Sequence, residues 1–170
     1  MAPFNHLDAE GKARMVDVGA KTPSHRVAVA SGWVALAPET VKAIQTGTVP
    51  KGDVLTVAKI AGIQGAKQTS NLIPLCHPLA LDQIDVGFDV RPGGVRIEAT
   101  AKTHAKTGVE MEALTAVCTA GLALIDMVKS ADRKAFLHHV QLDLKEGGKS
   151  GTWKRDPGDD SSPSAKAEGA

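Results

Sequence analysis

Residues 84–101 read IDVGFDVRPGGVRIEATA, and the pattern of this stretch decides the fold. Apolar residues occupy every second position from Ile84 to Val90 and again from Val95 to Ala101, with Arg91-Pro92-Gly93-Gly94 between the two runs. Alternation of this kind is typical of strands that bury one face, and a Pro-Gly pair favours a tight turn. The stretch therefore predicts an antiparallel hairpin with one face against the core.

On either side of this hairpin, the sequence predicts two further strands, at residues 27–36 and 140–144, and three helices, at residues 38–46, 53–69 and 111–130. The first helix opens with Pro, the second has Asp as its N-cap, and the third and longest carries a broad apolar face. Because strands and helices do not alternate strictly, we expect the α+β class, with helices covering one face of an antiparallel sheet.

The composition fits one domain with one core. The chain has 170 residues, of which 42% are hydrophobic, and we assign residues 1–155 to a single domain. The remaining segment, residues 156–170, consists mainly of small and charged residues. We predict that this tail is disordered, because it cannot bury enough area to offset the entropy lost on ordering.

Charge and targeting signals exclude several classes of partner. A formal net charge of +1 gives no extended positive field for nucleic acid. The N-terminus has no basic segment followed by an apolar run, and no stretch reaches the ~18 apolar residues of a membrane span. Cys76 and Cys118 form no CxxC pair. We expect a cytoplasmic protein with free thiols and no nucleic-acid or membrane partner.

Two segments are candidate binding loops. Pro50-Lys51-Gly52-Asp53 places a Lys beside a predicted helix N-terminus, which favours anions, although ordinary helix capping explains the same residues. Ile73-Pro74-Leu75-Cys76-His77-Pro78-Leu79 is stiffened by its prolines and could hold His77 rigidly. A buried structural His is the alternative. A metal bound by Cys76 and His77 is disfavoured, because no second pair of ligands has suitable spacing.

Charged residues on the longest predicted helix are the next candidates. Glu110 and Glu112 lie near its start. The helix dipole favours an acidic residue in the first turn and so accounts for one of them, but a second beside an apolar face is less expected. Asp126 and Lys129 are spaced i, i+3 among apolar residues, so we expect a partly buried pair that could act as acid and base; a surface ion pair is the alternative. Glu112 and Asp126 would lie ~21 Å apart along the axis. Either the substrate is long or another subunit completes the site, and we favour the second hypothesis.

The loop Lys145-Glu146-Gly147-Gly148-Lys149-Ser150-Gly151 resembles a truncated phosphate loop. Asp143 stands where the first Gly of GxxxxGK[ST] is required, and no strand–loop–helix context follows. We therefore reject an NTPase phosphate loop. A flexible basic loop that closes over an anion is the more plausible interpretation.

Six segments together resemble the cyclic pyranopterin monophosphate synthase family, or MoaC family. The most specific strings are IPLCHPL and TGVEMEALTA, and the resemblance covers about residues 4–152. The segments are residues 15–18, 51–54, 58–63, 72–79, 107–116 and 147–151.

The resemblance implies a lyase of molybdenum cofactor biosynthesis on a ferredoxin-like α+β fold. Such an enzyme converts 3′,8-cyclo-7,8-dihydro-GTP, supplied by a radical enzyme acting on GTP, to cyclic pyranopterin monophosphate and pyrophosphate. The resemblance also implies a homohexamer built as a trimer of dimers, with active sites at the dimer interface and no metal or cofactor. A catalytically inactive nucleotide-binding protein and a purely structural oligomer are the alternatives.

The resemblance also assigns residues. It makes Asp126, Lys51 and Lys129 catalytic. The remaining candidates contact substrate or phosphates: Leu75, Cys76, His77, Glu110, Met111, Glu112, Arg26, Lys67, Lys145 and Lys149. Where relatives commonly show Tyr-Asp-Met-Cys-Lys, this chain has Ile125-Asp126-Met127-Val128-Lys129. The departure keeps the Asp and the Lys but changes the packing around them.

Overall fold

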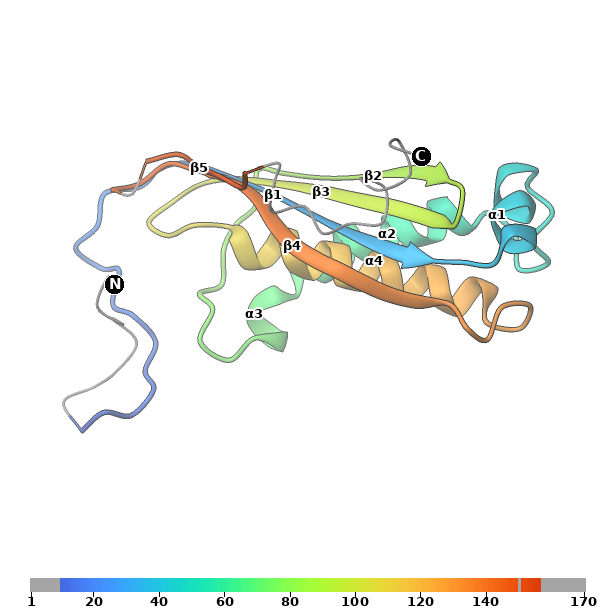
Figure 1. Ribbon diagram of the computed structural model, residues 1–170. Coiled ribbons are helices and arrows are strands. Elements are labelled where there is room, and N and C mark those ends of the chain that lie inside the picture. Colours follow the sequence, from blue (N-terminus) through green and yellow to red (C-terminus); the bar gives the residue numbers. More distant parts are fainter. Residues whose placement is uncertain (1–9, 150, 157–170) are drawn as a thin grey trace.

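Five strands form one antiparallel sheet in the order β2-β3-β1-β4-β5 in the computed structural model, which describes residues 10–149 and 151–156 (Figure 1). The strands are β1 (Ser24–Ala35), β2 (Gln83–Arg91), β3 (Gly94–Ala105), β4 (Phe136–Glu146) and β5 (Trp153–Lys154). With the intervening helices, β1 to β4 follow the βαββαβ order of the ferredoxin-like fold, and β5 extends the sheet. The predicted α+β, ferredoxin-like class is confirmed. Most of the tail predicted to be disordered, residues 157–170, lies outside the described residues.

The predicted hairpin is present as β2 and β3. These strands pair from Gln83 opposite Lys102 to Arg91 opposite Gly94, so the turn consists of Pro92 and Gly93 alone. Gly93 has φ +87°, which suits the third residue of a type II turn after a proline. On the inner face, five of the alternating apolar side chains are fully buried: Val86, Val95, Ile97, Ala99 and Ala101. The other three, Ile84, Phe88 and Val90, are half-buried.

The helices cover one face of the sheet, as predicted (Figure 1). They are α1 (Pro38–Gln45), α2 (Val54–Lys67), α3 (Thr69–Leu72) and α4 (Glu110–Val128). Asp53 caps α2 by accepting a hydrogen bond from the Thr56 N–H at 3.0 Å. Helices α2 and α4 pack closely because Gly65 has no side chain to separate them: a Cβ there would lie 2.6 Å from Cγ2 of Thr119.

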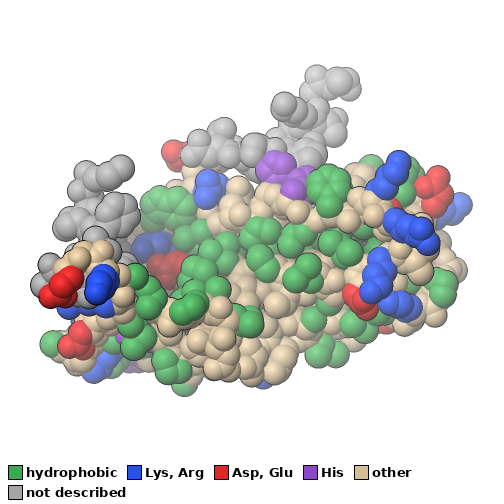
Figure 2. Space-filling view, turned by 90° about the horizontal axis from the view of Figure 1, so that it is seen from below, with side chains coloured by type: hydrophobic (Ala, Val, Ile, Leu, Met, Phe, Trp, Pro, Cys, Tyr) green, Lys and Arg blue, Asp and Glu red, His purple; other side chains and the backbone are tan. Residues whose placement is uncertain are grey.

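Helix α4 is the core helix of the domain. An 18-residue window within its 19 residues has a mean hydropathy of 1.6, which meets the length and composition of a membrane-spanning helix. The helix packs instead against α2 and against β1, β3 and β4, and 56% of the window is buried within the chain. Apolar side chains also gather over the middle of the outer helical surface (Figure 2).

Candidate active site

One group of predicted site residues meets at the C-terminal end of α4. Lys129 Nζ lies 2.7 Å from Asp126 Oδ1, and Lys51 Nζ lies 3.3 Å from Asp126 Oδ2. Lys51 also donates a hydrogen bond to the carbonyl oxygen of Asp126 at 2.7 Å. Lys51 belongs to the turn between α1 and α2, so its side chain reaches across to α4. We call these three residues the lysine–aspartate cluster.

The expectation of a partly buried Asp126–Lys129 pair is wrong. Their side chains are 58% and 61% exposed, because both residues lie on the outward side of α4 at its end. The hydrogen bonds from Lys129 and then from Lys51 nevertheless hold the pKa of the Asp126 carboxyl below its ordinary value. The carboxylate therefore stays ionised and can orient both ammonium groups.

A hollow of about 300 Å³ lies at the opposite end of α4. The proline-stiffened loop supplies Leu75, Cys76 and His77, and the first turn of α4 supplies Met111 and Glu112. Glu110, at the start of α4, also lines the hollow, so the structure brings together six residues that were predicted from the sequence to contact substrate. We call this hollow the Glu112 pocket.

Glu112 is the buried acid of this pocket, with a relative exposure of 4%. Burial raises the pKa of its carboxyl from 4.5 to about 7, and the neighbouring charge of Glu110 adds to the rise. A carboxyl with such a pKa can give or take a proton near neutral pH. Burial, assisted by Glu112, also raises the pKa of the Cys76 thiol, so that thiol is not an activated nucleophile.

A larger hollow, of about 770 Å³, adjoins the Glu112 pocket. The two hollows share Lys21, Thr107, Gly108 and Glu110 among their lining residues. We call the larger hollow the basic pocket, because five cations line it: Lys21, Arg26, Lys106, Lys145 and Lys149. Such a concentration of Lys and Arg favours a polyanionic ligand.

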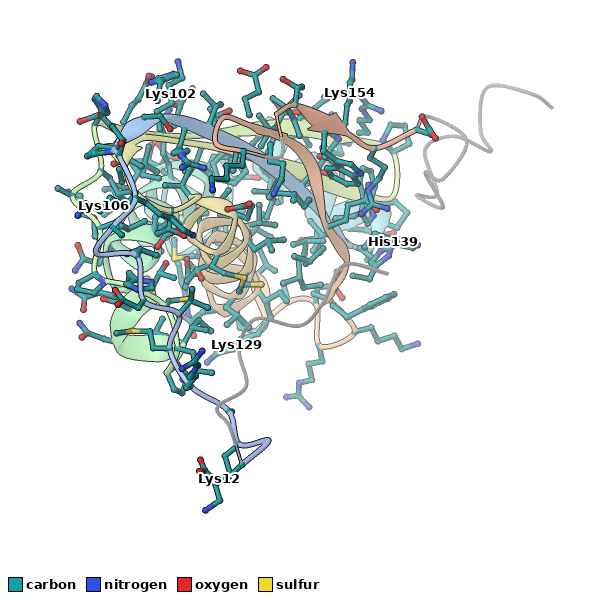
Figure 3. All side chains as sticks on the ribbon, turned by 90° about the vertical axis from the view of Figure 1, so that its left-hand side faces the viewer. Lys12, Lys102, Lys106, Lys129, His139 and Lys154 are labelled. Atoms are coloured by element: carbon teal, nitrogen blue, oxygen red, sulfur yellow. The ribbon has the colours of Figure 1, made fainter. Side chains whose placement is uncertain are left out.

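Protein groups fix two of these cations. Lys145 Nζ lies 3.1 Å from Glu110 Oε1, and both side chains are about one third exposed or less. Lys106 Nζ donates a hydrogen bond to the carbonyl oxygen of Gly19 at 2.7 Å. Figure 3 views α4 nearly end-on and labels Lys106, just before the helix, and Lys129, just after it. The basic pocket and the lysine–aspartate cluster therefore belong to opposite ends of one helix.

The structure changes the candidate list in two places. Lys21 and Lys106 line the basic pocket but were not predicted, although Lys106 directly precedes the TGVEMEALTA string. Lys67 was predicted to face phosphates, yet it lies exposed at the end of α2 and lines neither hollow. Within residues 10–149 and 151–156, no three His, Cys, Asp or Glu side chains form a group that could hold a metal ion.

Comparison with known proteins gives the family. A model of the MoaC family matches residues 15–148. The chain belongs to the MoaC family. Every candidate site residue except Lys149 falls within the matched MoaC region.

Relatives within the MoaC family are similar over nearly their whole length. The cyclic pyranopterin monophosphate synthase of Novosphingobium aromaticivorans is 52% identical over 154 residues, covering 91% of this chain and 98% of the relative. The synthase of Thermomicrobium roseum is 52% identical over 160 residues, covering 92% and 95%. The synthase of Corynebacterium efficiens is 52% identical over 153 residues, covering 90% and 99%.

Proposed function

We propose that this protein is a cyclic pyranopterin monophosphate synthase, a lyase of molybdenum cofactor biosynthesis. Its substrate would be 3′,8-cyclo-7,8-dihydro-GTP, and its products cyclic pyranopterin monophosphate and pyrophosphate. The observation that carries the proposal is the 52% identity over 91% of the chain to an enzyme named for this product. We further propose that a radical enzyme acting on GTP supplies the substrate and that the protein acts in the cytoplasm.

The two adjoining hollows suit the two parts of this substrate. The Glu112 pocket, with His77 and a carboxyl that titrates near neutrality, is suited to hydrogen bonding with the base-derived ring. The basic pocket is suited to the triphosphate and to the departing pyrophosphate, whose charge Arg26 and the lysines would neutralise. Because the hollows share lining residues, one extended ligand can occupy both.

The lysine–aspartate cluster supports proton transfer. Opening the guanine-derived ring and rebuilding it as a pterin requires repeated proton transfers and no net oxidation. In our proposal, Lys51 and Lys129 donate and accept protons and Asp126 orients them, since it contacts both ammonium groups. This is metal-free acid–base catalysis by the chain's own residues.

A second copy of the chain would bring the two halves of the site together. Glu112 and Asp126 are 14 residues apart on α4, which corresponds to ~21 Å. The outward side of α4 carries exposed apolar side chains: Leu122, between these two residues, is 62% exposed, and Met111, just before Glu112, is 37% exposed. Antiparallel packing of two such helices about a two-fold axis near residue 120 would set Asp126 of each chain opposite Glu112 of the other. We propose a dimer of this kind, and three such dimers in a hexamer.

Conversion of the substrate to product, detected as the oxidised fluorescent pterin, tests the activity. A protein that binds the substrate without forming pterin would instead be a catalytically inactive nucleotide-binding protein. The shared site is tested by mixing two variants that are each inactive alone, one from each half: Asp126→Asn and Glu112→Gln. Random mixing should restore roughly a quarter of wild-type activity, because half of the dimers are mixed and each mixed dimer has one intact site. No recovery in any mixture would argue that each site lies within one chain.

A further inference from the structure

Arg26 differs from the other cations of the basic pocket in how the protein holds it. It lies near the start of β1 and is half-buried, and its Nε is shielded from solvent without a hydrogen-bond partner. Lys145, by contrast, pairs with Glu110, and Lys106 with a backbone carbonyl. Among the residues that the structure describes, Arg26 has no ion-pair partner. A buried guanidinium nitrogen without a partner is costly unless a ligand satisfies the group.

Two glycines lie directly against Arg26. Gly147 and Gly148 follow β4 with φ +98° and +74°, a backbone conformation that disfavours other residues. A Cβ on Gly148 would overlap Nη1 of Arg26 and lie 2.7 Å from its Cζ. A Cβ on Gly147 would overlap the carbonyl oxygen of His25 and lie 3.1 Å from Cδ of Arg26. The backbone of this turn therefore approaches the arginine more closely than any turn with side chains could.

We propose that Gly148 is a positioning residue that seats the Arg26 guanidinium against the turn, so that it faces the phosphate chain in the basic pocket. The inference rests on the proposed function, because it takes the ligand of that pocket to be a polyphosphate. It also gives the Gly-rich loop a role other than cradling phosphate with its own N–H groups. The glycines of the loop position the Arg26 guanidinium, and the guanidinium binds the phosphate.

The two glycines have separable consequences. The overlap at Gly147 is with strand backbone, which cannot move without distorting β1. The overlap at Gly148 is with the end of a flexible side chain, which can swing away at small structural cost. Gly148→Ala should therefore keep the fold and displace Arg26, which makes it the informative variant.

The binding test uses inorganic pyrophosphate and calorimetric titration of the full chain. Gly148→Ala and Arg26→Ala should each raise the Kd for pyrophosphate about tenfold or more, the range for losing one charge-assisted contact. Adding Gly148→Ala to Arg26→Ala should change the Kd little further, because both act through the same guanidinium. Gly93→Ala is the matched control: Gly93 has φ +87° but no atom within 4 Å of its Cβ position, so it has similar backbone strain without the overlap.

Steady-state kinetics distinguish a positioning role of Gly148 from general damage to the protein. Gly148→Ala should raise KM for the substrate about tenfold and should lower kcat by no more than Arg26→Ala does, because it alters only the contact of that guanidinium with the phosphate chain. Wild-type pyrophosphate affinity in Gly148→Ala would overturn the inference, as would equal losses in Gly148→Ala and Gly93→Ala. If Gly148→Ala is too unstable for calorimetric titration, its Tm is measured instead. Adding Arg26→Ala removes the overlapping side chain and should restore the Tm to that of Gly93→Ala. A double variant whose Tm stays below that of Gly93→Ala would also overturn the inference. A wild-type protein that binds pyrophosphate but makes no pterin would count against the proposed function alone.

Discussion

Replacing Glu112 with Gln should stabilise the protein in a pH-dependent way. The unfolded carboxyl titrates near 4.5, whereas burial raises its pKa in the folded protein to about 7. Below pH 4.5 both states hold the proton, so the group has no effect on stability. As pH rises from 4.5 to 7, the unfolded state releases its proton first, and the free energy of unfolding falls. Above pH 7 the ionised, buried carboxylate lowers the free energy of unfolding by its full amount. This amount is about 3 kcal/mol, which corresponds to the difference between the two pKa values.

Gln has nearly the shape of a protonated Glu, so the variant avoids this cost. Glu112→Gln should equal wild type at pH 4 and exceed its free energy of unfolding by about 3 kcal/mol at pH 8. Urea unfolding at pH 4, 6 and 8, at one fixed protein concentration, measures the difference. Glu146→Gln, at an exposed glutamate, controls for the loss of one negative charge. A difference between wild type and Glu112→Gln that stays constant across this range would refute the argument from burial.

Three further variants test other contacts. Lys51→Met should abolish pterin formation while changing Tm little, because its ion pair with Asp126 is exposed; near-wild-type turnover would remove Lys51 from the mechanism. Asp132→Ala should lower the free energy of unfolding in urea by about 3 kcal/mol, because this buried carboxylate accepts the Ala37 N–H at 2.7 Å; an unchanged midpoint would contradict it. Gly65→Ala should lower the free energy of unfolding in urea by about 1–3 kcal/mol, because the added methyl group forces α2 away from α4. Adding Thr119→Ala should recover part of that loss, because it removes the side chain that the methyl group meets.

The parts of the fold that the sequence predicts are those with a local pattern. The β2–β3 hairpin and helices α1, α2 and α4 follow from alternation, capping and helical spacing, and their ends agree within a few residues. The four-residue helix α3 was not predicted. Strand β4 was predicted only at residues 140–144, because a register shift against β1 and the positive φ of His139 break the alternation near its start. Strand β5 has two residues and exists only through pairing with Leu144 and Lys145, which no local pattern can predict.

The candidate site divides in the same way. The positions of Glu112 and Asp126 at opposite ends of one helix follow from helix geometry and could be predicted. The contact between Lys51 and Asp126 could not, because these residues are 75 positions apart and meet only when α1 and α2 fold against α4. The exposure of Asp126 was mispredicted because Met127 and Val128, its apolar neighbours in sequence, face the core while Asp126 faces outward.

The outward direction of Asp126 and Lys129 bears on catalysis. Lys129 follows Met111 by 18 residues, five full helical turns, so both lie on the side of α4 that its own chain leaves uncovered. A cation and a carboxylate that are about 60% exposed are weak acid–base catalysts in water, because solvent screens their interactions. Covering this side of α4 with a second α4 would exclude that solvent and bring the lysine–aspartate cluster to the Glu112 pocket in one step. The same packing would therefore complete the site and give its charged groups the surroundings that proton transfer needs.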